Sequence, residues 1–349
     1  MDTDRLASRC LMVGLPGPML DPEIADKLES LKPAGVVLFG RNLVDPGPTR
    51  ELLDRCAVIL GEATLLAVDQ EGGRVSRLER WIGPTPSASR LASAGHETVR
   101  AFGRATGRAL RSIGFNLDFA PVVDLSPPGA ANGIADRAFD TTPDAVSRLA
   151  REFLEGLQGE GVAGCLKHFP GLGDSSVDSH HVLPTVARDR SALDASDLVP
   201  FRQLLGLAPC VMVGHGHYPA FDEAPLPATC SRSIVSDLLR RDLGFGGVIV
   251  SDDMEMGAIS ERDADGAAAV EAVTAGCDLL LYCSDLDKAR DAASALTRAA
   301  DGDPALGDRL ERSAARVERF ARAWPAAFDR ELTAAHDLAI QFDPFREWV

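Results

Sequence analysis

Short apolar runs alternate with longer amphipathic segments along most of the chain. Eight of these runs are almost continuously apolar, at residues 10–15, 35–39, 65–68, 115–123, 164–166, 210–213, 247–250 and 279–282. Longer segments that are rich in Ala, Leu and Arg and polar on one side lie between them, at residues 97–113, 142–161, 231–243, 263–275 and 285–300. Strands that are apolar on both faces are typical of a parallel sheet whose crossover connections are helices. The alternation predicts an α/β fold, a single-domain (βα)8 barrel of the TIM type.

The expected helix ends carry residues that commonly mark such boundaries. Thr142 precedes Pro143, so a capping residue is followed by a proline in the first turn. Gly161 and Gly276 are placed to end their helices, since glycine readily adopts the left-handed conformation found there. No internal repeat, block of charge or Ser/Gly-rich linker divides the sequence. We therefore expect one domain over residues 1–349, with 326–349 as a C-terminal packing tail.

Composition and charge narrow the class of protein. A chain of 349 residues of which 45% are apolar can bury a large single core. Its net charge of −16 disfavours nucleic acid and anionic membranes as partners, because their phosphates would repel it. Seven cysteines without a CxxC spacing are expected to be buried thiols in a reducing compartment. The acidic start of the sequence, MDTDRLASRC, and the lack of a long apolar stretch favour the cytoplasm.

Reactive polar residues follow several of the predicted strands. They are Asp69, Asp124, Lys167, His168, His215 and Asp252. The carboxyl ends of barrel strands meet at one rim, and this rim is where barrel enzymes have their active sites. Residues that are far apart in the sequence are therefore expected to converge on one pocket, which makes an enzyme the leading hypothesis.

Two short motifs carry the strongest candidate chemistry. Asp252 and Asp253 follow a strand, so the pair is consistent with a nucleophile and an orienting partner, or with a simple helix cap. Asp178 and His180 lie two positions apart in a loop with several glycines. In an extended segment such side chains point the same way, and a carboxylate beside an imidazole biases its tautomer and pKa, as a general acid/base requires.

Three longer motifs carry a family resemblance. KHFPG-x-GD-x-x-x-DSH begins at Lys167, DQEGGRVSR covers 69–77, and VIVSDDMEM covers 248–256. In this order they resemble the bacterial β-N-acetylhexosaminidases of glycoside hydrolase family 3. The resemblance implies a retaining exo-β-N-acetylglucosaminidase that needs no cofactor and no metal and that removes terminal β-linked N-acetylglucosamine. It also implies that the natural substrates are muropeptides released during peptidoglycan recycling.

The same resemblance assigns roles to individual residues. Asp252 would form the covalent glycosyl ester. His180, tuned by Asp178, would protonate the leaving oxygen and then deprotonate the incoming water. The expected sugar-binding residues are Asp69, Arg77, Arg137, Lys167 and His168.

Other residues in or near these motifs receive different expectations. Glu71 and Arg74 are expected to form surface ion pairs, and His217 is expected to be structural or exposed. His215 is a candidate pocket residue because it follows a strand. Leu172 stands where the family commonly has a histidine, a departure that bears on the preference for the leaving group more than on the reaction.

Four other interpretations stay open. The same barrel suits a β-glucosidase, or a β-N-acetylglucosaminide phosphorylase in which phosphate releases the sugar from Asp252. Five of the seven histidines fall within residues 168–217, including a His215-x-His217 pair, so a metal-dependent hydrolase is a third alternative. An inactive sugar-binding protein is the fourth, but it would need none of the catalytic residues. A sequence of this length is not expected to hold the second α/β sandwich domain of many family glucosidases, and this expectation favours the compact hexosaminidases.

Overall fold

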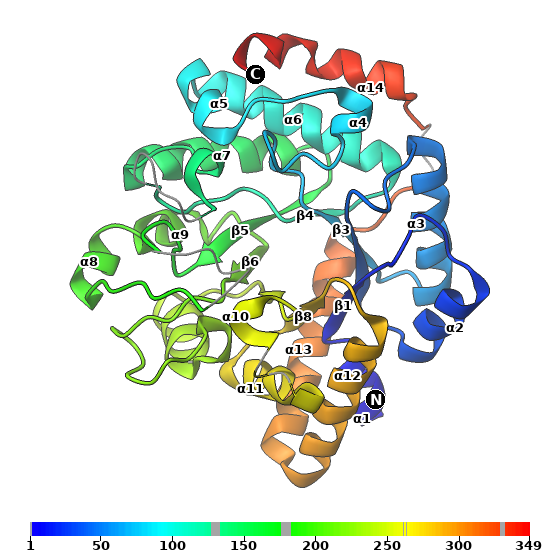
Figure 1. The fold of residues 1–349 in the computed structure, drawn as a ribbon, viewed down its shortest axis with the longest axis vertical. Coiled ribbons are helices and arrows are strands. Elements are labelled where there is room, and N and C mark those ends of the chain that lie inside the picture. Colours follow the sequence, from blue (N-terminus) through cyan, green and yellow to red (C-terminus); the bar gives the residue numbers. More distant parts are fainter. Residues whose placement is uncertain (1, 127–132, 176–182, 261, 263, 329–331) are drawn as a thin grey trace.

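The computed structural model describes residues 2–126, 133–175, 183–260, 262, 264–328 and 332–349. Within these residues, eight parallel strands form a closed barrel in which each strand pairs with its neighbours in chain order and β8 closes against β1 (Figure 1). The strands are β1 Leu11–Gly14, β2 Gly35–Leu38, β3 Leu65–Val68, β4 Leu117–Asp118, β5 Ala163–Phe169, β6 Cys210–Val213, β7 Val248–Asp253 and β8 Leu279–Tyr282. The predicted (βα)8 barrel is confirmed.

Helices form the outer layer around the barrel (Figure 1). The α-helices are α1 Thr3–Ser8, α2 Pro22–Leu31, α3 Pro46–Leu60, α4 Glu79–Ile82, α5 Ala88–Ala94, α6 His96–Ile113, α7 Pro143–Gln158, α8 Arg190–Ala195, α9 Leu198–Leu204, α10 Gly257–Ser260, α11 Ala267–Ala275, α12 Leu286–Gly302, α13 Pro304–Ala323 and α14 Ala335–Phe342. Shorter or differently wound helices are η1 Ala135–Arg137, η2 Ala228–Cys230, the π-helix η3 Ser233–Asp242, η4 Ala264–Gly266 and η5 Asp343–Trp348. The described helices lack the combination of length and apolar character that crossing a membrane requires.

The strands are buried on both faces, as their apolar sequences predicted. Along β1, for example, Met12 packs inside the barrel with Val37 and Ala67. The next residue, Val13, packs outside with Val36 beneath the helices. All seven cysteines are buried and free, in agreement with the expectation of buried thiols.

The structure corrects several predicted boundaries. Of the run at 115–123, Leu117–Asp118 forms strand β4, and Val122 forms an isolated parallel bridge with Lys167 beyond Pro121, which has no N–H to donate. Helix α7 begins at Pro143 as expected, but the hydroxyl of Thr142 donates to Asp140 (3.0 Å) instead of capping the helix. This helix ends at Gln158, earlier than predicted.

The C-terminal helices pack against α6 and α4. The ring of Phe102 on α6 meets the rings of Phe342 and Phe345 edge-on, with centroid distances of 5.8 and 5.2 Å. Arg346 donates to the carbonyl oxygens of Ile82 and Pro84. These contacts hold the end of the chain on the outside of the helical layer (Figure 1).

A buried carboxylate lies at the N-terminal end of β8, away from the rim where the strands end. Asp278 is fully buried and directly precedes β8. It accepts hydrogen bonds from Arg240 of η3 (2.6 Å) and from Arg316 (2.7 Å) and Ser313 (3.1 Å) of α13. The backbone N–H of Ile249 on β7 also donates to it (3.0 Å). Asp278 thus joins two outer helices to two strands beneath the barrel.

Candidate active site

A cavity of about 320 Å³ opens at the carboxyl ends of the strands. The predicted site residues that line it are Asp69, Arg77, Arg137, Lys167, His168 and Asp252. Asp69 directly follows β3, Lys167 and His168 belong to β5, and Asp252 belongs to β7. The fold therefore brings these strand-end residues to one pocket, as the sequence predicted. Asp178 and His180 lie outside the described residues.

Local irregularities in two strands place adjacent residues at the rim. Neighbouring residues of a regular strand point to opposite faces. The pairing of β5 with β6 shifts register between Leu166 and Phe169, and both Lys167 and His168 line the cavity. The pairing of β7 with β8 shifts in the same way before Asp253.

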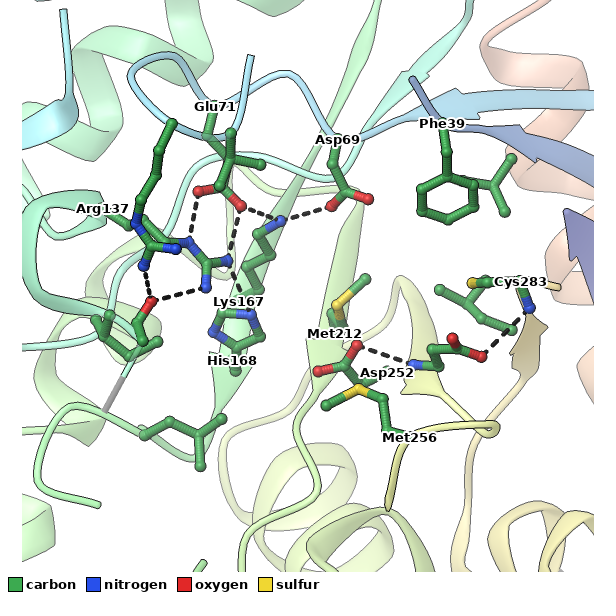
Figure 2. Close-up of a pocket in the computed structure, with 18 of the residues that line it drawn as sticks. Phe39, Asp69, Glu71, Arg137, Lys167, His168, Met212, Asp252, Met256 and Cys283 are labelled. Carbon is green, nitrogen blue, oxygen red and sulfur yellow. Dashed lines mark hydrogen bonds and ion pairs between the residues drawn. The ribbon is translucent and has the colours of Figure 1, made fainter. Parts of the chain in front are cut away.

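Lys167 is held between two carboxylates (Figure 2). Its Nζ lies 2.7 Å from Asp69 Oδ1 and 2.6 Å from Glu71 Oε1, and only 2% of the side chain is exposed. Burial alone would lower the pKa of Lys167, but the charges of Asp69 and Glu71 raise it above its ordinary value. Lys167 therefore stays protonated, and its ammonium group is held in one orientation.

Glu71 was predicted to form a surface ion pair, and this prediction is wrong. Its carboxylate is buried at the pocket and forms a two-point ion pair with Arg137, Nε to Oε2 and Nη2 to Oε1, both at 2.8 Å. Burial would raise the pKa of Glu71, but Arg137 and Lys167 together lower it well below its usual range. The same pairing raises the pKa of Arg137 despite its burial. Arg74, in contrast, pairs with Asp136 at the surface (3.0 Å), as predicted.

His168 is oriented by a second buried carboxylate. Its Nδ1 lies 2.7 Å from Asp124 Oδ2, so this nitrogen carries the proton and donates it. Asp124 Oδ1 accepts the backbone N–H of Leu172 (2.7 Å). The other ring nitrogen, Nε2, lies 3.5 Å from Nη2 of Arg137. Asp124 thus fixes the imidazole whose other nitrogen faces Arg137.

The two aspartates at the end of β7 have different surroundings. Asp252 lies beside Met212 and Met256, apart from the group around Glu71 (Figure 2), and its Oδ1 accepts the N–H of Asp253 (2.8 Å). The Oδ1 of Asp253 accepts the N–H groups of Glu255 (3.0 Å) and Cys283 (3.3 Å). Burial raises the pKa of Asp253 to about 6. Asp253 is therefore the residue that caps the following turn, while the nucleophilic role of Asp252 stays a prediction.

Arg77 lines the pocket, and within the described part of the chain it forms no ion pair. Its guanidinium lies over the ring of Phe39, 5.9 Å from the centroid, and its buried Nε has no hydrogen-bond partner among the described residues. The side-chain oxygen of Gln70 accepts the N–H of Arg77 (2.8 Å) and fixes the backbone there.

His215 was predicted as a candidate pocket residue, but it does not line the cavity. The ring is fully buried, with Nδ1 2.8 Å from Thr229 Oγ1 and Nε2 2.9 Å from the backbone oxygen of Asp253. It thereby supports the end of β7 from behind. His217 is buried as well, consistent with a structural role. In the described part of the chain no three His, Cys, Asp or Glu side chains are grouped to hold a metal ion.

Leu172, the departure from the family pattern, forms part of the pocket wall. It packs in a small apolar cluster with Val122, Ile134 and Ala138. Its methyl groups cover Gly214 and Gly216, where an added Cβ would lie only 2.9 Å from them. The two glycines therefore leave the space that Leu172 fills.

The carboxyl rim of this parallel barrel carries cationic donors and carboxylates. Such a rim is typical of an enzyme that binds a polar small molecule at its strand ends. The Glycosyl hydrolase family 3 N terminal domain matches residues 12–320. The chain belongs to this family and is a glycoside hydrolase, which confirms the resemblance seen in the motifs.

Known relatives extend over most of the chain. A protein named Beta-hexosaminidase from Alkalilimnicola ehrlichii is 39% identical over 310 residues, which cover 86% of this chain and 87% of the relative. A Beta-hexosaminidase from Pseudomonas aeruginosa is 38% identical over 82% of this chain and 86% of its own length. The solved family 3 β-N-acetylglucosaminidase of a Paenibacillus species superposes with a TM-score of 0.91 at 31% identity, covering all of this chain and 69% of that one.

Proposed function

We propose that this glycoside hydrolase is a retaining exo-β-N-acetylglucosaminidase. The observation that carries the proposal is that Asp252 shares one cavity with the convergent polar residues at the ends of β3 and β5. Polar groups on rigid strands suit the hydroxyl and acetamide groups of a sugar, and a carboxylate suits the formation of a glycosyl ester. The names of the relatives support N-acetylglucosamine as the sugar.

In the first step of the proposed reaction, a carboxylate oxygen of Asp252 attacks the anomeric carbon. The bond from that carbon to the leaving oxygen breaks, and the leaving oxygen takes a proton from His180. In the second step, His180 removes a proton from water, which attacks the same carbon and releases Asp252. Two inversions at one centre retain the β configuration. Asp178 would orient His180 and stabilise its charged form.

The remaining site residues would bind the terminal sugar. Lys167 and Arg137 would donate hydrogen bonds to the sugar, and Asp69 would accept hydrogen bonds from the sugar hydroxyl groups. His168, held by Asp124, presents a fixed imidazole, and Arg77 supplies a second guanidinium near Phe39. Because ion pairs already fix Lys167 and Arg137, little side-chain entropy is lost when the sugar binds.

The biological setting is a further part of the proposal. We propose one catalytic domain over residues 1–349 that works in the cytoplasm on muropeptides from peptidoglycan recycling. The support is the motif resemblance, the bacterial relatives and the seven buried free thiols. The packing of α14 on α6 supports a purely structural role for the C-terminal tail.

Turnover of aryl β-glycosides tests this function. The N-acetylglucosamine and glucose derivatives are each incubated with the enzyme, with and without phosphate, and the released sugar is identified. We expect free N-acetylglucosamine from the first substrate at a rate that does not depend on phosphate. A sugar 1-phosphate would identify a phosphorylase instead, and preference for the glucoside would overturn the substrate assignment.

A further inference from the structure

Glu71 occupies the centre of the charged group at the pocket, although no role follows for it from the sequence motifs. Its Oε1 receives hydrogen bonds from Lys167 Nζ (2.6 Å) and Arg137 Nη2 (2.8 Å), and its Oε2 receives one from Arg137 Nε (2.8 Å). The exposed fractions of the three side chains are 6% for Glu71, 2% for Lys167 and 12% for Arg137. One buried carboxylate therefore fixes two of the proposed sugar-binding cations (Figure 2).

The backbone around Glu71 is itself rigid. The N–H of Glu71 donates to the oxygen of Val75 (3.0 Å), which closes a tight turn through Gly72 and Gly73. Both glycines have positive φ angles, 98° and 55°, and a Cβ on Gly72 would lie 2.7 Å from the oxygen of Pro86. The turn thus presents the carboxylate in one position at the rim.

Arg137 depends on Glu71 more than Lys167 does. Lys167 lies on β5 and has a second carboxylate partner in Asp69. Arg137 lies on the three-residue helix η1, outside the barrel strands. Its guanidinium also lies 3.2 Å from the oxygen of Gly133 and 3.5 Å from His168 Nε2, which are longer contacts with groups that carry no negative charge. The two-point ion pair with Glu71 is what attaches this guanidinium to the barrel.

Glu71 is unsuited to direct proton transfer. Its two cationic neighbours keep its pKa well below the usual range, so it carries no proton at neutral pH. Both of its oxygens already accept hydrogen bonds from protein groups. These facts leave it the task of holding its neighbours.

We propose that Glu71 is a positioning residue that orients Arg137, and secondarily Lys167, toward the bound sugar. The proposal rests on the proposed function, because it concerns how the same sugar is held. It predicts that the charge and the reach of the carboxylate both matter. Glu71→Gln removes the charge at nearly constant size, and Glu71→Asp keeps the charge but withdraws it by one methylene.

The test measures kcat and KM for the aryl N-acetylglucosaminide, the Kd for N-acetylglucosamine by calorimetry, and the melting temperature. We expect both variants to lose about 30-fold in kcat/KM, since a hydrogen bond to a charged group contributes roughly a factor of 10 to 100. The matched control is Glu152→Gln, which alters an Arg100–Glu152 ion pair on the helical layer and should change kcat/KM less than twofold. Wild-type kinetics in either Glu71 variant would overturn the proposal.

A double-mutant cycle separates positioning from a general loss of structure. In an Arg137→Ala background the oriented group is gone, so Glu71→Gln should cost much less there than in the wild type. Equal losses in both backgrounds would mean that Glu71 does not act through Arg137. The pH dependence of kcat/KM should keep both limbs in Glu71→Gln, and loss of a limb would make Glu71 a titrating catalytic group instead.

Failure of this proposal is distinguishable from failure of the proposed function. If the wild type hydrolyses no N-acetylglucosaminide and does not bind the sugar, the proposed function is wrong. If the wild type is active but neither Glu71 variant folds at 20 °C, the carboxylate serves folding and the positioning role is wrong.

Discussion

Asp278→Asn should destabilise the protein without impairing its active site. Asp278 lies at the N-terminal end of β8, while the cavity lies at the carboxyl ends of the strands. The substitution keeps the shape of the side chain but removes the charge that faces Arg240 and Arg316 at 2.6 and 2.7 Å. In a barrel, residues at this end support stability, whereas those at the opposite rim support catalysis.

The structure sets the size of the effect. Breaking one partner of a buried ion pair costs about 3–5 kcal/mol. The two arginine side chains are 19% and 21% exposed, so water partly relieves them and the lower end, about 3 kcal/mol, applies. With an unfolding entropy of roughly 2.1 cal/mol/K per residue, 349 residues give about 0.7 kcal/mol/K, so the melting temperature should fall by about 4 °C.

Calorimetric melting and kinetics at 20 °C measure the two effects separately. The matched control is Asp237→Asn, which removes an exposed ion pair with Arg241 and should lower the melting temperature by less than about 1 °C. A melting temperature of Asp278→Asn equal to that of the wild type would refute the reasoning about the buried charge. A tenfold loss of kcat/KM in the folded variant would refute the separation of stability from activity.

Asp252→Asn should lower kcat at least about 1,000-fold with little change in the melting temperature, and a near-normal rate would remove Asp252 as the nucleophile. His180→Ala should slow natural disaccharides much more than aryl glycosides, whose leaving groups need little protonation; equal slowing would contradict the acid/base role. Burial raises the pKa of Asp118 well above its usual value, so this residue favours folding below about pH 4 and loses that benefit as the pH rises. Asp118→Asn should therefore increase the free energy of unfolding at pH 7 but not at pH 4, as measured by urea titration at both pH values.

The sequence predicted the barrel because its strands are apolar on both faces. It placed the ends of β5 and β7 too early, because their last residues are polar. Lys167 and Asp252 were expected to follow strands, but they lie within them. Polar residues at the ends of strands indicate the functional rim. They also make the last paired residues of a strand look like loop in the sequence.

The sequence predicted those site residues that are charged or titratable and lie at the end of an apolar run. Glu71 was missed because a glutamate before two glycines is also typical of an exposed turn. A usable signal was its spacing of two from Asp69, which places both carboxylates on one side of an extended segment. His215 was wrongly considered for the pocket, since a position near a strand end does not determine whether the side chain faces the cavity. The roles of Asp178 and His180 stay predictions.

The charges around the cavity bear on which nucleophile releases the sugar. Its charged lining residues are Arg74, Arg77, Arg137, Lys167, Asp69, Glu71, Asp252 and Asp253, four of each sign. The cations Lys167 and Arg137 are already paired with carboxylates, so the described lining offers a phosphate dianion no excess of positive charge. A neutral sugar does not depend on an excess of positive charge. It needs hydrogen-bond donors and acceptors in fixed positions. We therefore propose water rather than phosphate as the second nucleophile.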